Sequence, residues 1–341
     1  MPTKEDLQYY QAMPLDVKVA MTKNRIREWV REYGESGVYV SFSGGKDSTV
    51  LLHLVRQDFP NIEAVFVNTG LEYPEIQKFV KTFDNVTILR PKFRFDEVIK
   101  KYGYPIISKD VSLKCDNARK GGAYAADFIK GTKRETRNNG RYSLTKYRPL
   151  LSTDYLISNK CCDVMKKQPA KDYERKSGRK PIIATMAEES RLRTQKWLEQ
   201  GCNAFDAKRP SSKPMSFWTE QDVLQYIKQN NIPIASVYGE VVYANAPNQL
   251  RLFDFVDGGI EPLATSGCQR TGCIFCAFGC HLEKEPSRFQ RLKQTHPRQY
   301  EYCIGGGEYV DGIWQPNKDG LGMGQVFDEL NKIYGDGFIK Y

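Results

Sequence analysis

A pair of adjacent glycines at the end of an apolar stretch constrains this sequence more than any other feature. Residues 41–48 read Ser-Phe-Ser-Gly-Gly-Lys-Asp-Ser, the apolar run 37–40 before them predicts a strand, and the apolar pattern of 50–55 predicts a helix. Adjacent glycines let successive backbone N–H groups converge on an anion without obstruction by Cβ atoms. The helix start adds unpaired N–H groups and the positive end of its dipole. Because Lys46 adds a cation and Ser48 a hydroxyl donor, we predict a phosphate-binding loop.

Strand and helix patterns alternate on both sides of this loop. Residues 4–34 predict helices interrupted at Pro14, residues 62–67 and 86–89 predict buried strands, and residues 181–186 return to strand character. Alternation of this kind predicts an α/β fold with a doubly wound, mostly parallel sheet. Ligands of such sheets lie at the carboxyl ends of the strands, which is where the glycine loop stands.

We divide the chain into three parts. They are an N-terminal helical segment at 1–34, a nucleotide-binding α/β domain at 35–240 and a cysteine-rich C-terminal subdomain at 241–341. Within the second part, residues 105–160 are polar and basic and lack clean periodicity. We interpret them as a basic insertion or lid over the active site.

Composition limits the classes of protein to consider. The 341 residues are 40% hydrophobic and 27% charged, as in a globular protein. No apolar run approaches the roughly 18 residues of a membrane span, and the N-terminus lacks the apolar region of a secretory signal. These features predict a cytosolic (cytoplasmic) protein with no membrane partner. The net charge of +10 and the basic clusters at 114–148 and 166–180 favour a polyanion, either a nucleotide or a nucleic acid. A solvated basic face is the alternative.

The loop resembles a known nucleotide-binding motif. It has neither Walker spacing nor a Gly-x-Gly-x-x-Gly fingerprint, and Ser-Gly-Gly-Lys-Asp-Ser is similar to the PP-loop of the ATP pyrophosphatase superfamily. Those enzymes cleave ATP between the α and β phosphates. The resemblance implies that ATP binds to Ser41, Ser43, Gly44, Gly45, Lys46, Asp47 and Ser48. Of these, Lys46, Asp47 and Ser48 would be catalytic, with Asp47 holding Mg²⁺ or orienting the loop. An ordinary Gly-Gly turn that opens a helix is the alternative.

Three further motifs follow in order. Residues 68–75 (Asn-Thr-Gly-Leu-Glu-Tyr-Pro-Glu), 185–193 (Thr-Met-Ala-Glu-Glu-Ser-Arg-Leu-Arg) and 214–227, with its Trp-Thr-x-x-Asp-Val core, resemble motifs of the phosphoadenylyl-sulfate reductase-like family, whose fold is adenine nucleotide alpha-hydrolase-like. The resemblance implies nucleotide contacts from Thr69, Gly70, Glu189, Ser190 and Arg193. The chain departs from the pattern at Asn68, Tyr73, Thr185 and Ala187. At Ala187 the family has an arginine, and Arg191 is a candidate to compensate.

Nine cysteines in a cytosolic chain argue against a disulfide scaffold and favour a metal or redox role. Bacterial adenylyl-sulfate reductases of this family hold a 4Fe–4S cluster with a tandem Cys-Cys and a later Cys-x-x-Cys. By that resemblance the ligands here are Cys161, Cys162, Cys273 and Cys276. The alternatives are a set that includes Cys268 or Cys280, since Cys268, Cys273 and Cys276 have the spacing of plant-type ferredoxins, a structural zinc, and free thiols. The isolated Cys115, Cys202 and Cys303 are predicted to be structural.

The intact loop decides between branches of the family. The reductases have a modified loop and a Glu-Cys-Gly-x-His tail, neither of which matches here, whereas ATP-cleaving members keep Gly-Gly-Lys-Asp-Ser. The chain therefore looks like the DNA-phosphorothioation sulfurtransferase subunit and the cluster-dependent tRNA thiolases. This implies adenylylation of a substrate, release of pyrophosphate, and displacement of AMP by sulfur delivered through the cluster or a thiol. The implied partners are an adenine nucleotide, a nucleic-acid substrate, a sulfur-donor protein such as a cysteine desulfurase, and a second copy in a homodimer. Two alternatives stay open: a sulfonucleotide reductase, and a non-catalytic nucleotide- and nucleic-acid-binding module with a structural cluster.

Overall fold

The computed structural model of the chain describes residues 2–130, 144–244 and 262–341. Four of the basic residues of the predicted insertion, Lys133, Arg134, Arg137 and Arg141, lie outside these ranges. The chain forms two compact units. Unit 1 comprises residues 1–68, 72–89 and 170–271, and unit 2 comprises residues 69–71, 90–169 and 272–341.

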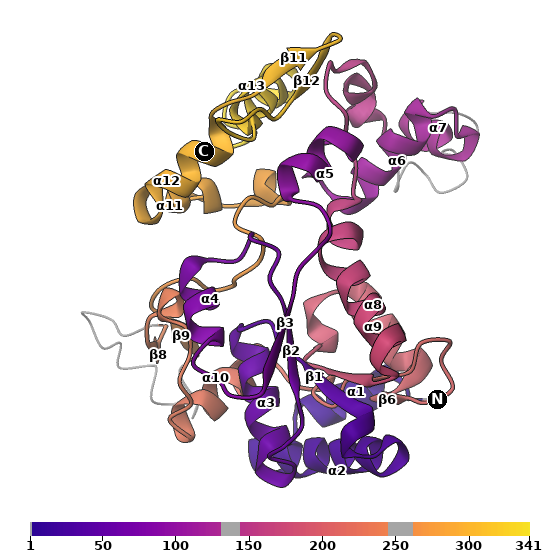
Figure 1. The fold of residues 1–341 in the computed structure, drawn as a ribbon, viewed down its shortest axis with the longest axis vertical. Helices are drawn as coiled ribbons and strands as arrows, with labels where there is room; N and C mark the ends of the chain where they lie inside the picture. The colour runs from indigo at the N-terminus through magenta and orange to yellow at the C-terminus, as the bar shows by residue number, and fades with distance from the viewer. Residues whose placement is uncertain (1, 131–143, 245–261) are drawn as a thin grey trace. The chain divides into compact units, whose positions relative to one another are not determined.

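Unit 1 is an α/β unit. Its helices are α1 (Lys4–Gln11), α2 (Leu15–Tyr33), α3 (Lys46–Asp58), α4 (Pro74–Val80), most of α8 (Gln168–Ser177), α9 (Arg191–Gln200) and α10 (Glu220–Gln229), with short 3₁₀ turns η1 (Glu35–Gly37), η5 (Ala187–Glu189) and η6 (Ser236–Tyr238). Its strands are β1 (Val38–Ser41), β2 (Ala64–Val67), β3 (Val86–Leu89), β5 (Lys180–Ile183), β6 (Asn203–Ala204), β7 (Ser211–Ser212), β8 (Val241–Tyr243) and β9 (Leu263–Thr265). Figure 1 shows β1, β2 and β3 side by side.

The central sheet has the strand order β3-β2-β1-β5-β7-β6, with only β6 antiparallel to its neighbour. The chain therefore moves outward from β1 through β2 to β3, and then continues on the other side of β1 at β5. Helices cover both faces, because Val38 and Val40 of β1 pack into the main core while Tyr39 packs edge-to-face on Tyr173 of α8. These observations confirm the predicted mostly parallel α/β sheet.

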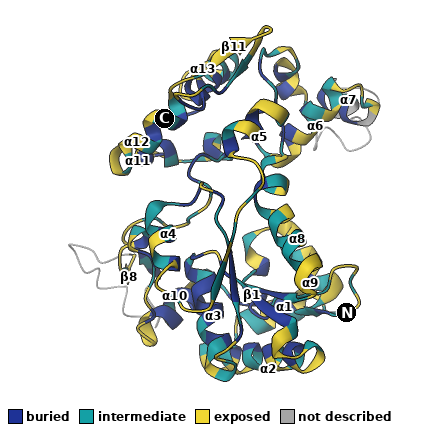
Figure 2. Ribbon diagram, viewed as in Figure 1, coloured by how far each residue is buried: buried dark blue, intermediate teal, exposed yellow. Residues whose placement is uncertain are grey.

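The core of unit 1 joins the N-terminal helices to the sheet. Most of β1 is buried (Figure 2). Trp29 of α2 and Trp218 before α10 are fully buried, and the Trp218 indole N–H donates a hydrogen bond of 2.8 Å to Thr22 Oγ1. Lys18 of α2 forms a buried ion pair of 2.7 Å with Asp222 of α10. The N-terminal segment is thus part of the α/β core rather than a separate layer.

Unit 2 is built from shorter elements. Its helices are α5 (Phe95–Tyr102), α6 (Lys109–Arg119), α7 (Ala123–Lys130), α11 (Arg288–Thr295), α12 (Pro297–Ile304) and α13 (Met323–Tyr334), with the helical turns η3 (Thr145–Ser152), η4 (Asp163–Lys167, a π-helix) and η8 (Cys280–Leu282). Its strands are β4 (Ile106–Ile107), β10 (Ala277–Phe278), β11 (Glu308–Val310) and β12 (Ile313–Gln315). Phe289, Phe327 and Leu330 are among its fully buried side chains.

The two units divide the chain differently from the boundaries predicted at 34/35 and 240/241. Residues 90–169 pack with residues 272–341, so the described part of the predicted insertion and the Cys-x-x-Cys segment belong to one unit. Boundaries predicted from the sequence assume that each part is one continuous stretch of chain. In unit 2, however, β4 pairs with β10, which lies about 170 residues later in the chain. A lid role for 105–160 stays a prediction.

Among the helices of the described ranges, none combines the length with the apolar character that crossing a bilayer requires.

Candidate active site

The glycine loop stands at the carboxyl end of β1, between that strand and α3. β1 is also the strand at which the order of the sheet reverses, since β2 lies on one side of it and β5 on the other. In open α/β sheets the crevice for ligands forms at this reversal, outside the carboxyl ends of the strands. The predicted phosphate-binding loop therefore has the position that a nucleotide site requires.

The loop backbone is held by its own side chains. The Ser43 N–H donates to Ser48 Oγ at 3.1 Å, and the Ser48 hydroxyl donates to the Gly45 carbonyl at 2.9 Å. Gly44 has a φ of +70°, and a Cβ on it would lie 2.7 Å from Val80 Cγ2. Position 44 therefore admits only glycine without a shift of α4.

Lys46 is nearly buried, with 5% of its surface exposed. Its ammonium pairs with the Glu220 carboxylate and donates a hydrogen bond of 2.7 Å to the Gln269 carbonyl. The Lys46 backbone N–H points to the Tyr238 hydroxyl at 3.4 Å, and that hydroxyl also contacts Thr271. The ammonium has three N–H donors and these two contacts use two of them, so one donor is left for a phosphate oxygen.

Asp47 carries the least compensated charge of the loop. Burial raises its pKa, Glu220 raises it further, and the positive charges of Lys46, Arg270 and Arg193 oppose this rise. Asp47 Oδ1 is buried and has no hydrogen-bond partner among the described residues. Mg²⁺ at nucleotide sites is typically bound by one or two carboxylates together with substrate phosphates. The orphaned oxygen fits that role.

The 185–193 motif follows β5, the neighbour of β1. Glu189 pairs with Arg193 and with Arg270, the latter at 2.8 Å. The Ser190 hydroxyl caps α9 by accepting the Arg193 N–H at 3.4 Å. Burial and the positive charge of Arg270 lower the pKa of Arg193, and Asp47 counteracts them, so the Arg193 guanidinium interacts electrostatically with the loop carboxylate. Glu189 holds Arg193 by an ion pair, while the Ser190 hydroxyl caps the helix.

The predicted nucleotide residues Thr69 and Gly70 belong to unit 2. The Leu71 N–H donates to Thr69 Oγ1 at 3.2 Å, and the Leu71 carbonyl accepts the Ile274 N–H at 2.8 Å. The 69–71 segment is therefore bonded to the stretch between Cys273 and Cys276. Sequence reasoning had grouped Thr69 and Gly70 with the loop alone.

The four predicted cluster cysteines are gathered by a short central segment of unit 2. β4 pairs in parallel with β10, which directly follows Cys276. On the other side, Tyr104 forms a bridge with Ile157, four residues before Cys161. The 104–107 segment therefore lies between the two cysteine segments. A hydrogen bond to Cys162, burial, and the charges of Cys162, Cys276 and Cys273 all raise the pKa of Cys161, so Cys161 interacts electrostatically with the other three thiols.

Cys162 differs from its neighbour. The hydrogen bond from Cys161, together with Lys109 and Lys166, lowers the pKa of Cys162 to about 6 although burial opposes it. Both cysteines stand in the first turn of the helical run that continues through η4, since the Asp163 N–H bonds the Lys160 carbonyl at 3.0 Å. A helix start stabilises a thiolate. Cys162 thus has the environment of a thiolate ligand.

The other cysteines are less suited to binding. Cys115, Cys280 and Cys303 are buried, and burial raises the pKa of Cys115 to about 11 and that of Cys280 to about 12. The Cys303 thiol contacts Met323 Sδ at 3.5 Å. Within the described ranges, no three His, Cys, Asp or Glu side chains are close enough to hold a single metal ion. In a 4Fe–4S cluster each cysteine binds a different iron, so the four cysteines lie farther apart than the ligands of a single metal ion.

Comparison with known proteins identifies the family. The phosphoadenosine phosphosulfate reductase domain matches residues 37–122 and 123–278. The chain belongs to this family. An adenosine 5′-phosphosulfate reductase of Staphylococcus haemolyticus is 27% identical over 63% of this chain and 70% of its own length.

In other relatives, the region that matches this chain is a smaller part of the relative's own length. An uncharacterized protein of Methanocaldococcus jannaschii is 23% identical over 78% of this chain and 46% of its own length. An adenosine 5′-phosphosulfate reductase of Bacillus cereus is 29% identical over 26% of this chain and 41% of its own. The chain thus spans less than half of these two relatives. The solved phosphate complex of the phosphoadenylyl-sulfate (PAPS) reductase from Candida auris has 13% identity and a TM-score of 0.38, covering 69% of this chain and 91% of that one.

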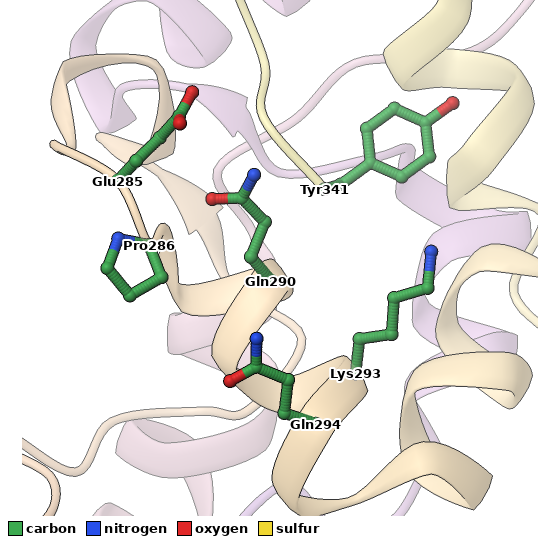
Figure 3. Close-up of a pocket in the computed structure, with 6 residues that line it drawn as sticks. All are labelled: Glu285, Pro286, Gln290, Lys293, Gln294 and Tyr341. Carbon is green, nitrogen blue, oxygen red and sulfur yellow. The ribbon is translucent and has the colours of Figure 1, made fainter.

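A separate hollow of about 540 Å³ in unit 2 does not involve the predicted residues. Figure 3 shows that Gln290, Lys293 and Gln294 line it from α11, with Glu285, Pro286 and Tyr341 around them. It contains neither the loop nor a thiol, so we do not assign the activity to it.

Sequence reasoning missed five residues at the two sites. They are Glu220, Tyr238, Gln269 and Arg270 at the loop, and Lys109 at the thiols. Glu220 lies within the 214–227 motif, but nothing in that motif marks it as a partner of Lys46. The other three loop residues follow Lys46 by 192 to 224 positions, and no local pattern marks them.

Proposed function

We propose that the chain is a PP-loop ATP pyrophosphatase-type enzyme that adenylylates a substrate for sulfur transfer. The observation that carries this proposal is the intact loop at the reversal of the sheet, with a nearly buried Lys46 and an unpartnered buried oxygen on Asp47. A carboxylate and an ammonium side by side suit a metal-bound polyphosphate better than a singly charged ligand.

The reaction at the loop is in-line substitution at the α-phosphorus of ATP. A substrate oxygen forms a bond to the α-phosphorus while the bond from that phosphorus to the bridging oxygen breaks, and pyrophosphate leaves with the electron pair. The backbone N–H groups of Gly44 and Gly45 and the Lys46 ammonium stabilise the negative charge that develops on the leaving group. A sulfur nucleophile then bonds to the substrate atom that carries the adenylylated oxygen, and AMP leaves with the electron pair of the bond between that atom and that oxygen.

Asp47 and Arg193 have complementary parts in this step. Mg²⁺ bound to Asp47 would neutralise charge on the pyrophosphate. Arg193, held by Glu189, presents a guanidinium close to Asp47. A planar guanidinium group donates two parallel hydrogen bonds to two oxygens of a phosphate. It therefore fixes the orientation of the phosphate as well as neutralising its charge.

In unit 2, an iron–sulfur cluster would be held by the thiols of Cys161, Cys162, Cys273 and Cys276. Three features of the structure support this assignment: four neighbouring thiols, a helix start beneath two of them, and the cations Lys109 and Lys166 beside Cys162. Such a cluster would supply electron-transfer or sulfur-handling chemistry. Its cationic surroundings would offset the charge of four thiolates.

The net charge of +10 supports our proposal that a nucleic acid is the substrate that accepts the sulfur. Part of the basic surface is already used within the protein, because Lys114, Lys120 and Lys167 pair with carboxylates one helical turn away. The remaining cations would contact phosphates without reading sequence. We further propose that a sulfur-donor protein is a partner and that the chain forms a homodimer.

A sulfonucleotide reductase is the second candidate, favoured by the names of the relatives from Staphylococcus haemolyticus and Bacillus cereus. Reductive cleavage of an adenylyl sulfate needs an accessible nucleophilic thiol. Cys303 does not provide one, since it is fully buried and burial raises its pKa well above the ordinary value.

One pair of assays separates these functions. Anaerobically prepared protein is incubated with labelled ATP and Mg²⁺, with and without transfer RNA or duplex DNA, and separately with phosphoadenylyl sulfate and a thiol reductant. We expect AMP and pyrophosphate from ATP, and at least about a tenfold loss in Lys46→Met, with Lys4→Met of the exposed face of α1 as the matched control. Sulfite from phosphoadenylyl sulfate without AMP from ATP would establish the reductase instead. Neither product would favour a binding module.

A further inference from the structure

The 185–193 motif lacks one cation that the family pattern has. Ala187 occupies the position of the missing arginine and is 1% exposed, packed in the core of unit 1. Arg191, suggested by the sequence as a substitute, is the exposed first residue of α9. The structure shows a different guanidinium at this place, that of Arg270.

Arg270 lies in a three-residue strap, Gln269–Thr271, that contacts the loop directly through Gln269 and indirectly through the partners of Arg270 and Thr271. The Gln269 carbonyl accepts from the Lys46 ammonium at 2.7 Å, and Thr271 bonds the Tyr238 hydroxyl that faces the Lys46 N–H. Between them, Arg270 Nη2 donates to Glu189 Oε2 at 2.8 Å. The backbone on both sides of Arg270 is therefore fixed against the loop.

The charges around Glu189 do not cancel. One carboxylate, Glu189, pairs with two guanidinium groups, Arg193 and Arg270, so it neutralises only one of them, and both also act on the Asp47 carboxylate. The Arg270 side chain is 68% exposed, whereas that of Glu189 is 12% exposed. A guanidinium has five N–H donors, and only one of them is used by Glu189. Arg270 thus has donors left for an anion.

We propose that Arg270 binds a phosphate of the nucleotide at the loop and replaces the arginine missing at position 187. Glu189 orients it, as it orients Arg193, so that two guanidinium groups from different parts of the chain approach the polyphosphate. The inference rests on the proposed function, since it requires ATP at the loop.

The test measures binding of ATP and of adenosine, with Mg²⁺ present, to the full chain. Arg270→Gln is expected to weaken ATP binding at least about tenfold and to leave adenosine binding unchanged, because adenosine has no phosphate. Arg270→Lys should restore part of the affinity. Arg25→Gln is the matched control, since Arg25 also pairs with a carboxylate, Glu28, at 2.9 Å, but on α2. Thermal melting checks that all variants fold.

The other outcomes overturn the inference in distinguishable ways. Unchanged ATP binding in Arg270→Gln, with loss in Lys46→Met, rejects Arg270 and leaves the proposed function standing. Equal loss of ATP and adenosine binding shows that Arg270 only holds the strap. A loss in Arg191→Gln but not in Arg270→Gln assigns the missing cation to Arg191. Absence of ATP binding in the wild-type chain rejects both the inference and the proposed function.

Discussion

Gly44 shows at the level of one residue how the loop depends on its neighbours. Its φ of +70° is costly for any residue with a Cβ, and that Cβ would also lie 2.7 Å from Val80 and 2.8 Å from Ile76 of α4. Gly201 at the end of α9 has a similar φ of +68° but open space around it. The two glycines therefore separate the cost of backbone conformation from the cost of crowding.

We expect Gly201→Ala to lower the free energy of unfolding by ~1–3 kcal/mol, because a φ of +68° with a ψ of −155° is a conformation that essentially only glycine adopts. Gly44→Ala should cost a further ~1–3 kcal/mol, because α4 must move to admit the methyl group. Urea denaturation of both variants measures the difference. Equal losses of unfolding free energy in the two variants would mean that α4 moves at no cost to admit the methyl group and that α4 does not fix the loop.

Asp47 gives a prediction about pH. Its folded pKa is raised, chiefly by burial, above the ordinary 3.8, so its ionised form is less favourable in the folded chain than in the unfolded one. The resulting destabilisation is absent below that ordinary pKa and develops as the pH rises through the folded value. Asp47→Asn should therefore have a higher urea midpoint than the wild type at pH 7.5, and the difference should vanish near pH 3.8.

The same substitution should weaken binding of ATP with Mg²⁺, because it removes the carboxylate. Stability and binding would then change in opposite directions, as expected of a residue kept for function. A lower urea midpoint for Asp47→Asn at pH 7.5 would show that the carboxylate has a stabilising partner and would contradict its assignment as a metal ligand.

At the level of elements, α10 is held to α2 by one buried ion pair. Lys18 is 2% exposed and Asp222 is 7% exposed, and Asp222 also caps α10 by accepting from the Thr219 N–H at 2.7 Å. Asp222→Ala leaves the Lys18 ammonium buried without its partner, which should cost ~3–5 kcal/mol. Asp172→Ala is the control, because its exposed pair with Arg175 should contribute at most about 0.5 kcal/mol. Similar urea midpoints for both variants would contradict this account.

Elements with a strong local pattern could be predicted from the sequence. The strand at 86–89 was predicted at its observed bounds, and the strand at 62–67 was two residues too long, because buried apolar runs mark such strands. β4 could not be predicted. It has two residues, and Ile107 within it has a φ of +60°, which only its pairing with β10 sustains.

The same distinction holds for the candidate site. Lys46 and Asp47 lie on a motif that one stretch of chain contains complete, and the cysteines have spacings that can be compared with a family. Glu220, Tyr238 and Arg270 reach the loop from parts of the chain that only folding brings together. Their residue types are common, so no local signal could have separated them from ordinary surface residues.

For the whole molecule, the chemistry is distributed over two units. The loop with Arg193 and Arg270 belongs to unit 1, while the four candidate cluster cysteines and Lys109 belong to unit 2. The chain crosses between the units at several points, among them the 271–272 bond, two residues after Gln269 and one before Cys273. The 271–272 bond therefore joins the strap at the glycine loop directly to the segment that carries the Cys-x-x-Cys motif.

Metal analysis tests the second unit. Anaerobically prepared protein should contain about four irons per chain, and Cys161→Ala or Cys273→Ala should lose most of that iron. Cys202→Ala, in unit 1, is the control and should retain it, since burial raises the pKa of Cys202 and it has none of the cationic neighbours of Cys162. Iron content that is unchanged in Cys161→Ala and Cys273→Ala, or zinc in place of iron, would contradict the cluster assignment.

The bond that the chain breaks in ATP tests the central claim most directly. Labelled ATP is incubated with the protein, Mg²⁺ and a candidate nucleic-acid acceptor, and all nucleotide and phosphate products are separated and quantified. We predict AMP and pyrophosphate in equal amounts, with both lost together in Lys46→Met. ADP and inorganic phosphate in their place, or ATP left uncleaved while sulfite is released from phosphoadenylyl sulfate, would contradict the account.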